Sequence, residues 1–142
     1  MNAAHSIAVL NRLLARLCRS LPQYLADGFP WHRPGDQRGP EVLQQIIADQ
    51  QAMAGRVAEA VLDRRGAPDS GEFPMDFTDT QFLSLDFLVR ELIHYQQQDV
   101  AAIARCASEL IRDRAARELA EEALGQARAH LEALEELARQ PA

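Results

Sequence analysis

Residues 119–137 read LAEEALGQARAHLEALEEL, and this stretch decides the fold class. Its period of three and four residues places the apolar side chains on one face of an α-helix and the Glu and Arg side chains on the other. We therefore expect an amphipathic helix at about 114–139, capped by Asp113, that packs on other helices. The apolar positions are Leu119, Ala120, Ala123, Leu131, Leu134 and Leu137.

Three earlier stretches show the same period, and no convincing strand is present. We expect helices at about 5–26, 41–65 and 79–110. Pro22 predicts a kink or break near 19–21, because proline lacks the amide donor and clashes with the preceding turn. The segment 78–81, Thr-Asp-Thr-Gln, reads as a capping box at the start of the third helix.

The connections between these helices predict how the bundle is assembled. Two are short and one, rich in Gly and Pro, is longer. This pattern is compatible with a single domain, 1–142, that is all-α and folds as an up-down-up-down antiparallel four-helix bundle.

Composition excludes several classes of function. The chain has 142 residues, no Lys and a net charge of −6, so a nucleic-acid backbone would be repelled. No stretch approaches the roughly 20 apolar residues of a membrane span. The N-terminus lacks the basic and apolar regions of a signal peptide, so we expect a cytoplasmic protein whose Cys18 and Cys106 are free thiols.

The layout resembles the ferritin-like superfamily, in particular bundles of the bacterioferritin and rubrerythrin kind. The likeness covers nearly the whole chain and rests on the helix lengths and on two segments. Residues 57–68, VAEAVLDRRGAP, resemble the end of the second helix of that family. Residues 121–131, EEALGQARAHL, resemble its final helix. The resemblance implies a bundle that, in the family, houses two metal ions.

The resemblance also implies which positions would carry the metal ligands. The family uses a Glu from each of two helices and a Glu-x-x-His from each of the other two. Here Gln50 and Met53 match one Glu-x-x-His, and Ala127 and His130 match the other. The remaining two helices show no inward Glu at that level. Most ligands are replaced, so the resemblance implies that the dimetal site has been lost and that no cofactor is bound.

Other polar residues offer alternatives. The only Glu-x-x-His is Glu91-Leu92-Ile93-His94, which the helical period turns away from the bundle. Glu91, His94 and His130 are the candidate ligands of an unorthodox iron site. Otherwise we expect His130 to be a core-edge histidine bonded to Gln50 or Asp99. Gln50, Gln96 and Asp99 are candidates for a buried polar network.

Four large apolar residues are candidates for an interface. Phe29 and Trp31 lie in the first loop, where we expect them to fold back over one end of the bundle or, alternatively, to contact a partner. Leu83 and Phe87 lie on an outward helix face, which indicates a dimer surface or cover from a loop. They predict a homodimer. The leading interpretation is a non-enzymatic ferritin-like bundle that acts through protein association. One alternative is a metal-dependent, iron-containing redox protein. The other is a binder of an unknown small molecule in the core, where Ala120, Ala123 and Ala127 leave space opposite Leu17 and Leu92.

Overall fold

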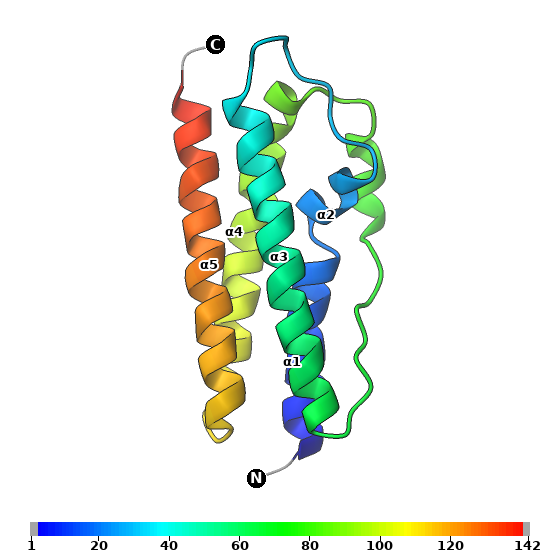
Figure 1. Cartoon of the computed structure of the whole chain (residues 1–142), viewed down its shortest axis with the longest axis vertical. Helices are drawn as coiled ribbons and strands as arrows, with labels where there is room; N and C mark the ends of the chain where they lie inside the picture. Colours follow the sequence, from blue (N-terminus) through cyan, green and yellow to red (C-terminus); the bar gives the residue numbers. More distant parts are fainter. Residues whose placement is uncertain (1–2, 141–142) are drawn as a thin grey trace.

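The computed structural model describes residues 3–140, and it confirms an all-α fold. Four long helices run side by side, and a short helix follows the first of them (Figure 1). Within residues 3–140, no helix has the length and apolar composition needed to cross a membrane. The elements are α1 (Ala3–Cys18), α2 (Leu21–Ala26), α3 (Arg38–Asp63), the 3-10 helix η1 (Met75–Thr80), α4 (Leu85–Glu109) and α5 (Arg114–Arg139).

The break expected at Pro22 is present and separates α1 from α2. Ser20 lies between the two helices in an extended conformation, and its Oγ accepts a hydrogen bond of 3.4 Å from the backbone N–H of Gln23. Proline in the first turn of α2 is tolerated because an amide there has no helical partner to lose. Helix α1 therefore ends at Cys18, and α2 begins at Leu21 after only two intervening residues.

The helices do not alternate in direction along the chain as expected. The first turns of α3 and α4 meet where Gly39 lies against Leu85, whereas Arg64, just after α3, binds Asp113, just before α5. The reason is that residues 64–84 return along the length of the bundle as a crossover (Figure 1). The order is thus up, down, down, up. Each neighbouring pair, α1/α3, α1/α4, α3/α5 and α4/α5, is antiparallel.

The start expected for the third long helix is wrong. The hydroxyls of Thr78 and Thr80 donate to the carbonyls of Met75 and Phe77, so they are satisfied inside η1 and do not cap an α-helix. Helix α4 begins at Leu85 instead, where the Oγ of Ser84 accepts from the backbone N–H of Phe87. By contrast, Asp113 caps α5 as predicted and accepts from Ala116 N.

Two groups of buried side chains form the core, one toward each end of the bundle. Alanines of α5 and leucines of α1 dominate the group near the α4–α5 turn. The other group includes Phe77 of the crossover. The side chain of Phe77 is 3% exposed, so it anchors the crossover to the core of the bundle. Trp31 and Ser84 form an isolated parallel β-bridge that ties the first loop to the start of α4.

Candidate functional site

The four positions that match the family metal motif all lie in the core. Gln50 and Met53 are buried on α3, and Ala127 and His130 are buried on α5. Met53 packs among apolar neighbours. The helical spacing in the sequence therefore correctly predicted that these positions lie inside the bundle. Whether they can bind a metal ion depends on the hydrogen bonds that they form.

Gln50 and His130 form hydrogen bonds with different partners from those expected. The Oε1 of Gln50 accepts from Ser20 Oγ at 2.7 Å and from Gln23 Nε2 at 3.1 Å. His130 Nε2 lies 2.8 Å from Asp49 Oδ2, so the expectation that it would bond Gln50 or Asp99 is wrong. The partner is the half-buried residue next to Gln50, one position off the centre of the apolar face of α3.

Asp99 has a cationic partner that the sequence did not suggest. Its Oδ1 accepts from the guanidinium of Arg16 at 3.2 Å. Burial raises the pKa of Asp99 to about 6, and the interaction with Arg16 offsets part of that rise. Gln96 donates to the carbonyl of Ala127 at 3.0 Å, while its buried Oε1 has no partner among the described residues. Gln50, Gln96 and Asp99 thus bond to separate partners and not to one another.

These side chains surround a cavity of about 10 Å³ in the middle of the bundle. That volume is near the minimum of about 10–15 Å³ that admits one water molecule. It is far below the roughly 300 Å³ of the smallest ordinary ligand pocket. The space expected beside Ala123 and Ala127 therefore does not accommodate a small molecule.

The same residues do not fit a dimetal centre. Hard cations need several carboxylates. Here Asp99 is paired with Arg16, and Asp49 is hydrogen-bonded to the only imidazole lining the cavity, that of His130. A guanidinium at the edge of the cavity adds a positive charge where metal ions would need negative ones.

The alternative metal ligands are not assembled into a site either. His94 is exposed, and its Nε2 lies 3.1 Å from Gln98 Nε2. Glu91 is half-buried on the same helix. In the described part of the chain, no three His, Cys, Asp or Glu side chains come together as a metal-binding group, so Glu91, His94 and His130 do not form one.

A larger hollow lies at the end of the bundle where the first loop and the crossover meet. We call it the aromatic groove. Its volume is about 800 Å³. The edge-on packing of Tyr24 on Phe73, with ring centroids 5.3 Å apart, forms part of its wall, and Phe77 packs behind both rings. The groove is lined by Tyr24, Leu25, Asp27, Gly28, Phe29, Pro30, Trp31, Phe73, Thr80, Gln81, Phe82 and Leu83.

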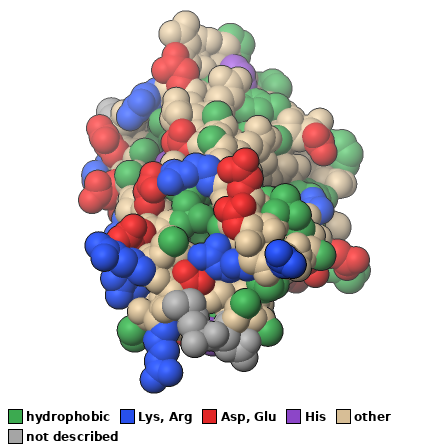
Figure 2. Space-filling view, turned by 60° about the horizontal axis from the view of Figure 1, so that its bottom comes forward, with side chains coloured by type: hydrophobic (Ala, Val, Ile, Leu, Met, Phe, Trp, Pro, Cys, Tyr) green, Lys and Arg blue, Asp and Glu red, His purple; other side chains and the backbone are tan. Residues whose placement is uncertain are grey.

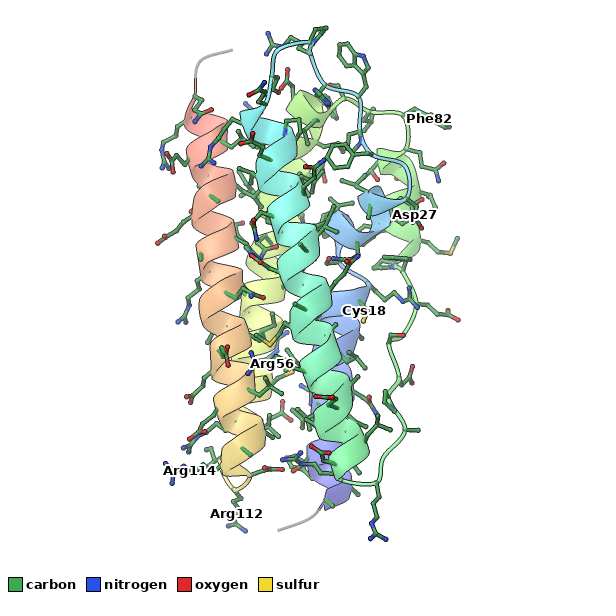
Figure 3. All side chains as sticks on the ribbon, viewed as in Figure 1. Cys18, Asp27, Arg56, Phe82, Arg112 and Arg114 are labelled. Atoms are coloured by element: carbon green, nitrogen blue, oxygen red, sulfur yellow. The ribbon has the colours of Figure 1, made fainter. Side chains whose placement is uncertain are left out.

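The residues expected at an interface divide into two kinds. Phe29 and Leu83 are half-buried and pack against the core. Trp31 and Phe87 are exposed, at 65% and 63%. Phe82, which the sequence did not single out, is fully exposed and points away from the bundle (Figure 3). Its φ of +69° lies in the left-handed region, which no sequence pattern around it indicated.

Acidic side chains lie in the aromatic groove and along the crossover that borders it. Asp27 lines the groove, Glu72 and Asp79 are the chain neighbours of the groove residues Phe73 and Thr80, and Asp76 lies between them on η1. All four are exposed, and none forms an ion pair within residues 3–140. Arg19 stacks over Phe73 and donates to a loop carbonyl, but it forms no ion pair with these carboxylates within residues 3–140. The crossover beside the groove therefore carries carboxylates that no ion pair neutralises in that part of the chain.

The opposite end differs in charge. There, Arg and acidic side chains are interspersed (Figure 2). Several are joined in ion pairs, including Arg12 with Glu109 and Arg64 with Asp113. Ion pairs thus neutralise part of the charge at that end, whereas Asp27, Glu72, Asp76 and Asp79 have no such partner within residues 3–140.

Compared with protein-family models, with the curated proteins and with the solved structures, the chain matches none. The function has to be inferred from the residues of the chain themselves.

Proposed function

We propose that the protein is a ferritin-like four-helix bundle without a dimetal centre, which acts through protein association at the aromatic groove and not through catalysis. The single long crossover, residues 64–84, supports the ferritin-like part, because ferritin-like folds have one such connection. The two unpaired thiols, Cys18 and Cys106, support a cytoplasmic location as part of the same proposal.

The observation that carries the proposal is Phe82. A large apolar side chain that is fully exposed gains nothing from folding, and a non-glycine residue with a φ of +69° adds a cost on the order of 1 kcal/mol. The chain thus keeps a residue that favours neither its stability nor its solubility. Burial of the ring by another protein supplies the missing benefit.

The surroundings of Phe82 have the features of a binding surface. Trp31 is also largely exposed, and the groove that Phe82 and Trp31 both line contains the rings of Tyr24, Phe29 and Phe73 and the carboxylate of Asp27. Met75 of η1 and Phe87 of α4 are exposed as well. Aromatic residues are enriched at the energetic centres of protein interfaces. In the core, in contrast, Gln50 and His130 form internal hydrogen bonds, and the cavity beside them has room for about one water molecule.

Comparison of native complexes tests the proposal. The tagged chain and its Phe82→Gly variant are produced in the cells that make the protein, and both extracts are separated by size. We expect the parent to elute in a complex and the variant to elute near the 15.8 kDa of the single chain. An exposed site on α5, changed by Ala129→Ser, is the matched control. Elution of the parent as a single chain would refute the proposal.

A homodimer, which the sequence predicted, is the competing form of association. Its contact would use Trp31 and Phe87, which are exposed as a dimer surface requires. Sedimentation equilibrium of the purified chain at tens of micromolar measures it directly.

A further inference from the structure

We infer that the partner segment bound by the aromatic groove is a cationic amphipathic helix from another protein. This inference rests on the proposed function and specifies the chemistry of the partner. It is drawn from two properties that occur together at this end of the bundle: exposed apolar rings and unpaired carboxylates.

The groove offers an apolar helix face both a shape that fits it and exposed rings. The groove of about 800 Å³ is walled by Tyr24 and Phe73, and Trp31 and Phe82 stand exposed at it. A helix whose apolar residues recur every three or four positions can place one row of side chains into such a groove. The same rings offer cation–π contacts to Lys or Arg of the partner, as Phe73 already does to Arg19.

The crossover beside the groove is acidic. From Gly66 to Val89 the sequence contains five acidic residues and no Arg, Lys or His. Only Asp86 among them is paired, with Arg33. Within residues 3–140, Glu72, Asp76 and Asp79 remain exposed without an ion pair. Carboxylates on a segment that borders an apolar groove attract a cationic segment and orient it on approach.

The same charges disfavour a second copy of this chain as the occupant. In a two-fold dimer, each surface meets an identical surface. The acidic residues of one groove would then face those of the other, and like charges across an interface oppose association. A cationic helix meets the same carboxylates with opposite charge.

Trp31 makes the inference measurable, because it is the only tryptophan in the chain and lies at the groove. Synthetic helices of roughly 18 residues, with Leu at every third and fourth position and either Lys or Glu elsewhere, are titrated into the protein. We expect the Lys helix to shift the Trp31 emission to shorter wavelength. Added salt should weaken this binding, because exposed charges are screened. The Glu helix should leave the emission unchanged.

Two variants separate the apolar and the charged contributions. Phe82→Gly should weaken binding of the Lys helix by at least about tenfold. The combination of Glu72→Gln, Asp76→Asn and Asp79→Asn should weaken it to a similar degree and reduce its salt dependence. The matched control removes three exposed carboxylates elsewhere, by Glu59→Gln, Glu132→Gln and Glu136→Gln, and should bind like the parent.

Each other outcome contradicts the inference. Equal binding of the Lys and Glu helices would mean that charge does not select the partner. Self-association of the purified chain that Phe82→Gly abolishes would make a second copy the occupant. If neither helix binds, but the native complex depends on Phe82, the partner class is wrong while the proposed function stands. If that complex is missing as well, both fail.

Discussion

Phe82 provides the sharpest test, because it separates stability from function. Two substitutions are compared: Phe82→Ala removes the ring but keeps a side chain at a φ of +69°, and Phe82→Gly removes both the ring and the strain. The ring is fully exposed, so its loss should not change the free energy of unfolding appreciably. Phe82→Ala should therefore unfold like the parent.

The glycine variant should be more stable than the alanine variant. Glycine adopts the left-handed region without the clash of a Cβ, which is worth about 1 kcal/mol, reduced somewhat by its greater freedom in the unfolded chain. For a domain of this size, that corresponds to a rise of about 2–4 °C in Tm. Urea unfolding and thermal melts followed by circular dichroism measure both values.

The same two variants should both lose the associated partner. A more stable chain that no longer binds cannot be explained by misfolding. The reasoning would be refuted if Phe82→Ala lowered the free energy of unfolding by more than about 1 kcal/mol, because the ring would then pack within its own chain. It would equally be refuted if both variants kept the native complex.

Three further predictions concern stability. Arg65, just after α3, has a φ of +63°, so Arg65→Gly should raise the free energy of unfolding by about 1 kcal/mol in urea titrations, and an unchanged value would contradict this. The raised pKa of Asp99, about 6 against 3.8, means that its contribution to stability is fully present below pH 3.8 and is lost as the pH rises through 6. Asp99→Asn should therefore flatten the dependence of stability on pH across that window, and an unaltered urea profile would disprove the assignment. Asp113→Ala removes both the cap of α5 and the ion pair with Arg64, so it should lower the free energy of unfolding by on the order of 3 kcal/mol, measured in thermal melts. Asp113→Asn keeps the cap and should lower the free energy of unfolding by less. Equal losses for the two variants would contradict separate contributions of the cap and the ion pair.

Local chemistry explains what could be predicted from the sequence. The apolar period predicted four long helices because each must bury one face. Pro22 predicted a break, and Asp113 predicted a cap, because both effects act within one turn. The burial of Gln50 and His130 followed from the same period.

Contacts between distant segments explain which features could not be predicted from the sequence. A connection of the length of 64–84 is compatible with a turn or with a crossover. In the structure it is a crossover, and its Phe73 and Phe77 pack against Tyr24 of α2. Tyr24 and Phe73 also line the aromatic groove, so the helix order and the candidate site both involve contacts that no local pattern specifies.

The hydrogen bonds of the core were missed for a related reason. Asp49 lies beside the inward face of α3 and reaches His130 only because α5 packs against that edge. Arg16 reaches Asp99 from another helix by extending its long side chain. Helical periodicity predicts the direction in which a side chain leaves its helix. It does not predict which partner is reached by a long side chain or by one at the border of the inward face.

Photo-crosslinking inside the cells that make the protein tests the central claim most directly. A photoreactive phenylalanine analogue is placed at Phe82 or, as a control, at the exposed Ala129 of α5. The account predicts a discrete adduct with another protein from position 82, crosslinked through a segment rich in Lys or Arg, and none from position 129. Equal adducts from both positions, or none from position 82, would contradict it.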